Sequence, residues 1–120
     1  MTSSDKLMIT LLKDIPGVGK FANHKPTLRN YADIIAEKFL IDYQNFYLYP
    51  HEGRVRLHII CHHVNKGPKV QTLIDVVKKG LIYVAFDKED QIEYISVAKV
   101  PAESKKYQRL QIYVEYVYFD

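Results

Sequence analysis

The 120-residue sequence contains one cysteine, no tryptophan, and only five glycines and five prolines. Because Cys61 stands alone, an intramolecular disulfide and a multi-cysteine metal site are both excluded, which is typical of a reducing compartment. No apolar run approaches the roughly 20 residues needed to cross a bilayer, and the N-terminus lacks the layout of a signal peptide. We therefore expect a cytoplasmic protein with no membrane-spanning segment.

The composition is that of a folded domain, with 48% hydrophobic and 26% charged residues. The length suits a single domain over residues 1–120, with residues 1–5 expected to be disordered. Lysine and arginine outnumber aspartate and glutamate by 17 to 14, which permits an anionic partner without requiring one. The 10 tyrosines are the unusual feature, because tyrosine-rich surfaces favour interfaces and stacking.

Hydrophobic periodicity and turn-forming residues divide the chain into expected strands and helices. Strands are expected at residues 6–15, 46–49, 54–64, 81–86, 92–100 and 107–119, and helices at residues 27–40 and 68–79. Pro68 suits the first position of the second helix, and Gly80 suits its C-terminal cap. The first strand is expected to be central in the sheet, and residues 46–49 are expected to form a hairpin with residues 54–64.

The expected order is β-α-β-β-α-β-β-β, which resembles a ferredoxin-like fold, β-α-β-β-α-β, with additional C-terminal strands. We therefore predict an α+β fold in which a mainly antiparallel sheet has two helices packed on one face. The other face would be open, and a binding function is expected there.

Residues 15–20, Ile-Pro-Gly-Val-Gly-Lys, resemble the central turn of a helix-hairpin-helix motif, which implies contact between backbone N–H groups and a DNA phosphate. In that motif the turn joins two helices, whereas the residues through Pro26 leave no room for a second helix. A P-loop is disfavoured because Phe21 stands where Ser or Thr must bind magnesium. The segment is either an anion-contacting loop that uses Lys20 or a glycine-rich connection without a ligand.

A histidine and cysteine cluster in residues 58–63 is the only metal-like pattern. His58 and His62 share one face of the expected strand but lie about 13 Å apart along it. Cys61 and His63 fall on the opposite, core-directed face. We therefore expect no metal site, and no catalytic serine or cysteine arrangement is indicated.

The segment Arg56-Leu57-His58-Ile59-Ile60 resembles the histidine-hydrophobic-histidine motif of rolling-circle replication initiators. That resemblance implies a metal-dependent single-strand endonuclease with a tyrosine nucleophile on a helix. Here Arg56 replaces the first histidine, and the second expected helix contains no tyrosine. Tyr107 would supply the nucleophile only if a short helix forms around it. A degenerate nicking enzyme is one alternative, and a non-enzymatic DNA-binding relative is another.

The expected strand at residues 54–64 places Arg54, Arg56 and His58 on one face. The neighbouring strand adds either Tyr47 and Tyr49 or Phe46 and Leu48 to that face. Cations beside flat rings are the combination that grips a single strand through phosphate contacts and base stacking. The leading hypothesis is a small non-enzymatic nucleic-acid-binding protein of viral or plasmid origin, which favours single strands. Its expected binding residues are Arg54, Arg56, His58, Tyr47, Tyr49, Lys66 and Lys20.

A competing hypothesis is a protein-interaction or inhibitor module that docks through its tyrosine-rich surface. The C-terminal run of residues 113–119 is apolar and tyrosine-rich, and an exposed edge strand would pair with a second copy or another protein. We therefore expect either a homodimer through this strand or, if the strand lies centrally, simple core packing. No cofactor is expected.

Overall fold

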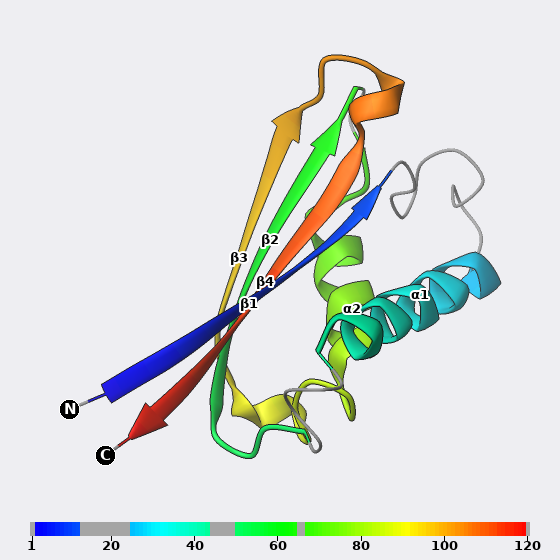
Figure 1. The fold of residues 1–120 in the computed structure, drawn as a ribbon. Helices are drawn as coiled ribbons and strands as arrows, with labels where there is room; N and C mark the ends of the chain where they lie inside the picture. The colour runs from blue at the N-terminus through cyan, green and yellow to red at the C-terminus, as the bar shows by residue number, and fades with distance from the viewer. Residues whose placement is uncertain (1, 13–24, 44–49, 65–66, 120) are drawn as a thin grey trace.

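The computed structural model describes residues 2–12, 25–43, 50–64 and 67–119. Its elements, in chain order, are β1 (Thr2–Leu12), α1 (Lys25–Tyr43), β2 (Arg54–His63), α2 (Val70–Leu81), the 3-10 helix η2 (Glu89–Gln91), β3 (Ile92–Pro101), the 3-10 helix η3 (Lys105–Tyr107) and β4 (Arg109–Phe119). The four strands form one mixed sheet, and both helices pack on the same face of it (Figure 1). The α+β class and the two-helix layer are therefore confirmed.

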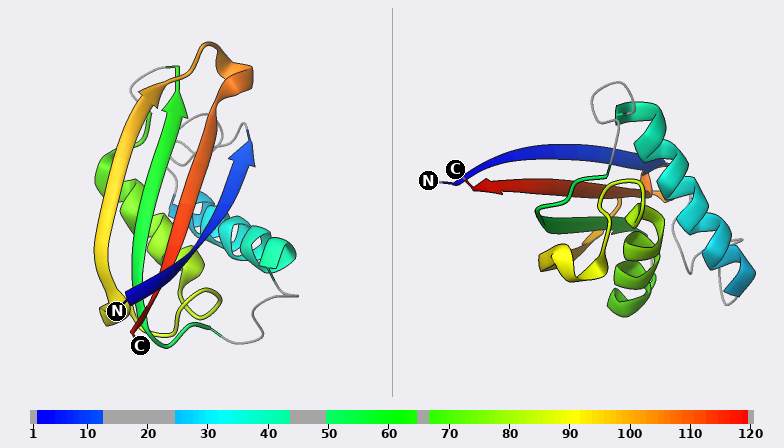
Figure 2. Two further views of the ribbon diagram at one scale, coloured as in Figure 1. Left: turned by 60° about the vertical axis from the view of Figure 1, so that its left-hand side comes forward. Right: turned by 90° about the horizontal axis from the view of Figure 1, so that it is seen from below.

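The sheet order is β1-β4-β2-β3, with β4 antiparallel to both of its neighbours and β2 parallel to β3. Val114 of β4 pairs with Leu7 of β1 on one side and with Leu57 of β2 on the other. The edges are therefore β1 and β3, as the views in Figure 2 also show.

One expectation about strand position is wrong, and one open alternative is decided. The first strand is an edge, and the C-terminal strand lies inside the sheet, paired on both sides. Pairing of β4 with a second copy as an edge strand is therefore not available. A ferredoxin-like order is not what the described strands form, because alternation reveals which side chains of a strand are buried but not which strands are neighbours.

The N-terminal residues are more ordered in the structure than the sequence suggested. Thr2–Asp5, expected to be disordered, form the start of β1 and pair with Phe119–Tyr116 of β4. The expected strand at residues 46–49 and its hairpin lie outside the described residues. None of the described helices is long and apolar enough to cross a membrane.

The expected strand at residues 81–86 is instead a turn that follows α2. The helix runs to Leu81, whose carbonyl accepts hydrogen bonds from the N–H groups of Val84 and Ala85, at 3.1 and 2.8 Å. Tyr83 then has a φ of 73°, in the left-handed region that a branched or bulky residue rarely adopts. Ala85 and Phe86, the last residues of this apolar run, are buried because they pack into the core. They do not form part of a strand.

The core lies between the helices and the sheet face that they cover. It is built from alternate residues of β1, β2 and β4 and from buried residues of each helix, with partly buried residues of β3 packed against them. The fully buried large side chains are Tyr31, Tyr116, Phe86, Ile9, Ile35, Leu57, Ile59, Leu73, Leu81, Leu110 and Ile112. Gly80 does not cap α2 but lies within it, where a Cβ would sit 2.8 Å from the Ala32 carbonyl oxygen of α1. The two helices can approach this closely because residue 80 has no side chain.

A side chain of α1 covers part of the β1 edge. The Tyr43 hydroxyl donates to the Met8 carbonyl at 2.6 Å and accepts from the Met8 N–H at 2.7 Å. Edge strands expose unpaired backbone groups of this kind, and covering them limits association through the edge. In the described part of the chain, β3 has no such cover and pairs with β2 alone.

Candidate functional site

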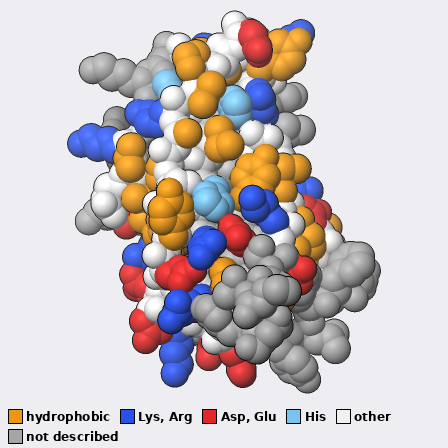
Figure 3. Space-filling view, turned by 90° about the vertical axis from the view of Figure 1, so that its left-hand side faces the viewer, with side chains coloured by type: hydrophobic (Ala, Val, Ile, Leu, Met, Phe, Trp, Pro, Cys, Tyr) orange, Lys and Arg blue, Asp and Glu red, His pale blue; other side chains and the backbone are white. Residues whose placement is uncertain are grey.

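The sheet face opposite the helices is the candidate site. The alternation predicted for β2 is confirmed: Val55, Leu57, Ile59 and Cys61 are buried toward the helices. The alternate residues of β2, Arg54, Arg56, His58, Ile60 and His62, face away from them, together with the in-register residues of β3 and β4. Figure 3 shows this face, on which apolar side chains and histidines lie among lysines, arginines and carboxylates.

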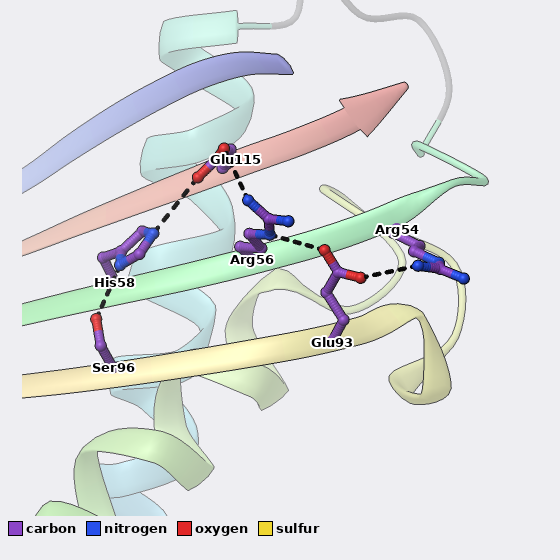
Figure 4. Close-up of polar contacts among 6 residues, drawn as sticks. All are labelled: Arg54, Arg56, His58, Glu93, Ser96 and Glu115. Atoms are coloured by element: carbon purple, nitrogen blue, oxygen red, sulfur yellow. Dashed lines mark hydrogen bonds and ion pairs between the residues drawn. The ribbon is translucent and has the colours of Figure 1, made fainter. Parts of the chain in front are cut away.

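Arg54, Arg56 and His58 lie together on this face, as expected, but each contacts a carboxylate. Arg56 Nε donates to Glu93 Oε1 at 2.7 Å, and Arg54 Nη1 donates to Glu93 Oε2 at 3.3 Å. Glu115 of β4 lies 3.6 Å from Arg56 Nη1 and 3.5 Å from His58 Nε2. Figure 4 shows the resulting chain of contacts across three strands. We call these five residues the charged network.

The charged network has two arginines and two carboxylates, so it is electrically neutral whenever His58 is neutral. The hydrogen bond from Arg56 lowers the pKa of Glu93, and the same bond raises the pKa of Arg56. Both groups therefore keep their charges over the whole neutral range. A phosphate that approaches the two arginines would have to compete with carboxylates already in contact with them.

A β-bulge brings Glu93 into the charged network. Val55 of β2 is in register with Ile92 of β3, but the next residue, Arg56, is in register with Tyr94. One residue of β3, Glu93, is therefore extra, and a bulge of this kind turns a side chain toward a different face. No pattern in the sequence marks this bulge, and the expected site did not include Glu93 or Glu115.

The Gln91 side chain fixes the start of β2 beside the start of β3. Its Nε2 donates to the carbonyls of His51 and Gly53, both at 2.7 Å. Its Oε1 accepts from the N–H groups of Asp87 and Lys88, at 2.9 and 2.6 Å. All four hydrogen bonds are made by one amide, which positions Arg54 and Glu93 close to one another.

His58 is held by partners on both neighbouring strands. Its Nδ1 lies 2.8 Å from Ser96 Oγ, and Tyr94 packs on the imidazole with ring centroids 5.6 Å apart. Ser96, His58 and Glu115 thus follow one another in the order of a hydrolytic triad, but with the imidazole nitrogens exchanged, because a triad serine contacts Nε2 and its acid contacts Nδ1. The three cavities lined by residues 75–95 and 103–109 include neither Ser96 nor His58 in their lining.

A second feature lies where β2 and β3 end and β4 begins. Segment 99–109 holds four cations and one carboxylate. Its net charge of +3 equals the net charge of the whole chain. We call the four cations the basic end: Lys99, Lys105, Lys106 and Arg109. In the described part of the chain none of them forms an ion pair, whereas Arg54, Arg56, Lys38 and Lys78 all do.

The basic end adjoins the open face through Arg109. Arg109 is in register with His62 of β2, and His62 is in register with Val100 of β3. His62 Nε2 also lies 3.0 Å from Gln111 Oε1 on β4. The sequence signal for this region is the run Lys105-Lys106-Tyr107, followed by Arg109. From the sequence alone, this run is only a candidate short helix.

A cavity of about 510 Å³ opens at the basic end. Its lining residues are Glu103, Lys106, Tyr107, Gln108 and Arg109. Arg109 Nη1 donates to the Tyr107 carbonyl at 2.8 Å, and Lys106 Nζ lies 5.0 Å from the centroid of the Tyr107 ring. Two cations and one aromatic ring therefore share a single hollow.

The remaining expected site residues are not described. Tyr47, Tyr49, Lys66 and Lys20 all fall outside the residues that the structure describes. Their place relative to Arg54, Arg56 and His58 stays a prediction.

A short helix does form at Lys105–Tyr107, which the nicking-enzyme alternative required. However, Tyr107 precedes Arg109, whose partner in register is His62. His62 is four residues from His58, or about 13 Å along an extended strand. The tyrosine and the histidine of that alternative are therefore not brought together.

The thiol and the histidines of the expected cluster lie apart. Cys61 is fully buried, and burial raises its pKa to about 11. Among the described residues, no three His, Cys, Asp or Glu side chains converge as metal ligands would.

No protein-family model matches the sequence, and no curated protein is significantly similar to it.

Proposed function

We propose that the protein binds single-stranded nucleic acid along the open face of its sheet, with the phosphates held at the basic end. The observation that carries the proposal is the position of Lys105, Lys106 and Arg109, cations without carboxylate partners among the described residues, at the border of an open face. Backbone phosphates are attracted by such cations whatever the base sequence.

Exposed rings supply the second requirement of single-strand binding. Tyr94 is 53% exposed on β3, and Tyr107 is 47% exposed beside the basic end. Bases of any sequence stack on such rings, and each stacked base contributes roughly 1–3 kcal/mol. Arg54 and Arg56 have a smaller part in this proposal than the sequence suggested, because Glu93 and Glu115 already neutralise them.

Fluorescence anisotropy of labelled single-stranded RNA, single-stranded DNA and duplex DNA tests the proposal over a range of salt concentrations. The variant Lys105→Ala/Lys106→Ala removes two charges from the basic end. Each lost phosphate contact lowers the salt slope by about 0.7 for single strands, so a decrease of up to about 1.4 is expected.

The variant Arg54→Ala/Arg56→Ala is the matched control because it removes the same number of charges from the charged network. We expect it to lower the slope by less than half as much. Equal decreases in both variants would mean that only net charge matters. Flat titrations with all three nucleic acids at micromolar protein would end the proposal.

A protein-docking function is the second candidate, and the neutrality of the charged network favours it. Beside that network, Met8 and Tyr94 are more than a third exposed and form apolar surface. Aromatic and apolar surface of this kind is typical of the centre of protein interfaces. Capture of a partner that persists at high salt and is lost in Tyr94→Asp would support this candidate, whereas salt-sensitive capture would count against it.

A further inference from the structure

We propose that the cavity at the basic end holds one ribonucleotide of a bound RNA strand, with its base on Tyr107, its phosphate at Lys106 and Arg109, and its ribose hydroxyl at Glu103. This inference rests on the proposed nucleic-acid binding and names its ligand class and one subsite. The cavity volume of about 510 Å³ lies within the range of small-molecule pockets.

The phosphate position follows from the two cations that line the cavity. One Nη1 hydrogen bond to the Tyr107 carbonyl fixes the Arg109 guanidinium and leaves its other N–H groups to point elsewhere. Lys106 adds an ammonium group over the Tyr107 ring, 5.0 Å from its centroid. A phosphate between them would meet two positive charges that no carboxylate neutralises among the described residues.

The base position follows from Tyr107. Its ring is 47% exposed and lines the same cavity as the two cations. A base that stacks on this ring lies one sugar away from its own phosphate, which places that phosphate near the cations. Gln108 strengthens the polar lining, because its Oε1 accepts from the Val64 N–H at 3.2 Å and its amide N–H groups remain as donors.

The sugar position follows from Glu103, the only carboxylate that lines the cavity. A carboxylate accepts hydrogen bonds and repels a phosphate, so it favours a ligand that offers a donor group. Ribose offers the 2′-hydroxyl, which is the group that distinguishes RNA from DNA at a binding site. The same side chain would find no such donor on deoxyribose.

The test compares a short labelled oligoadenylate with its deoxyribose counterpart by anisotropy, using the whole protein. We expect the RNA to bind more tightly, by roughly 10-fold for one hydrogen bond to a charged acceptor. Glu103→Ala should abolish this preference by weakening RNA binding alone. Tyr107→Ala should weaken both strands by roughly 5- to 150-fold, the loss of one stacked base, and Tyr107→Phe should retain binding.

Tyr83→Ala is the matched control, because Tyr83 is exposed but lies after α2 and does not line the cavity. Circular dichroism of each variant shows whether it is folded. If both strands bind equally and Tyr107→Ala has no effect, the ribonucleotide subsite is overturned while the proposed function stands. If neither strand binds, both fall together.

Discussion

Glu93 Oε1 of β3 accepts a hydrogen bond from Arg56 Nε of β2 at 2.7 Å, across a parallel strand pair. The contact exists because the bulge after Ile92 places Glu93 on the open face. Arg56, which would otherwise present its charge to solvent, is therefore paired with Glu93, and Arg54 shares the same carboxylate.

Replacing Glu93 should therefore remove the carboxylate that Arg54 and Arg56 share, while Arg56 keeps its longer contact with Glu115. We expect Glu93→Gln to tighten single-strand binding and to increase the salt slope by up to about 0.7 for each arginine that gains a phosphate. Anisotropy titrations at several salt concentrations measure both quantities. Glu89→Gln removes the same charge from a residue paired with Lys78, and an equal gain in that variant would attribute the effect to net charge.

Gly80→Ala should destabilise the fold by about 1–3 kcal/mol, the usual cost of overpacking. Alanine is the better helix former by roughly 1 kcal/mol, so an unhindered site would show the opposite sign. The new Cβ would lie 2.8 Å from both the Ala32 carbonyl oxygen and Ile35 Cβ, and a backbone oxygen cannot move aside cheaply. Urea unfolding measures the change, with exposed Lys79→Ala as the control. A stabilised Gly80→Ala would show that α1 and α2 adjust freely.

Stability should fall as the pH falls below about 6.5, the ordinary value for histidine. Burial lowers the pKa of His51, which stacks on Tyr116 with ring centroids 4.3 Å apart. Burial, with help from Lys99 and His62, also lowers the pKa of His63. Below pH 6.5 the unfolded chain therefore binds protons that the folded chain does not, and the free energy of unfolding decreases.

Urea unfolding at pH 7.5, 6.5 and 5.5 checks this dependence, and His51→Phe should reduce it while keeping the ring stack. The Glu93 carboxyl does not interfere, because its pKa is lowered and its effect begins only below about 4.5. A stability that rises toward pH 5.5 would contradict the expected sign.

Cys61 should resist thiol reagents in the folded protein. Its side chain is fully buried, and a pKa of about 11 leaves very little thiolate at pH 8. The rate of reaction with Ellman's reagent should therefore be slow and should rise steeply with urea as the chain unfolds. A fast reaction that urea does not accelerate would show that the core around Cys61 opens without unfolding.

Local patterns predicted a good part of the fold. Alternation in residues 54–64 gave β2 and its buried side, and the helical spacing after Pro68 gave most of α2. Strand order was not predictable, because the apolar alternation of β4 fits an edge or a central strand equally well. The run of residues 81–86 was misassigned as a strand, since a short apolar run is the same signal whether it pairs in a sheet or packs as a turn.

The candidate site was predicted less completely than the fold. The shared face of Arg54, Arg56 and His58 followed directly from strand alternation. The neutralisation of the two arginines could not be predicted in this way, because Glu93 and Glu115 lie far from them in sequence and reach β2 only through strand pairing. The basic end was visible as a local cluster of charge, but its place at the border of the open face depends on the register of Arg109 with His62.

The central position of β4 also has a consequence for how the chain assembles. β1 and β2 have no direct pairing; each is joined to β4, whose residues come after all the others in the chain order. During synthesis, β1 can pair only after β4 has been made, and β4 is also the strand that joins β1 to the β2–β3 pair. Nascent chains therefore expose the edges of β1 and β2 that later pair with β4 until residues 109–119 emerge from the ribosome, a stage at which association with other chains competes with folding.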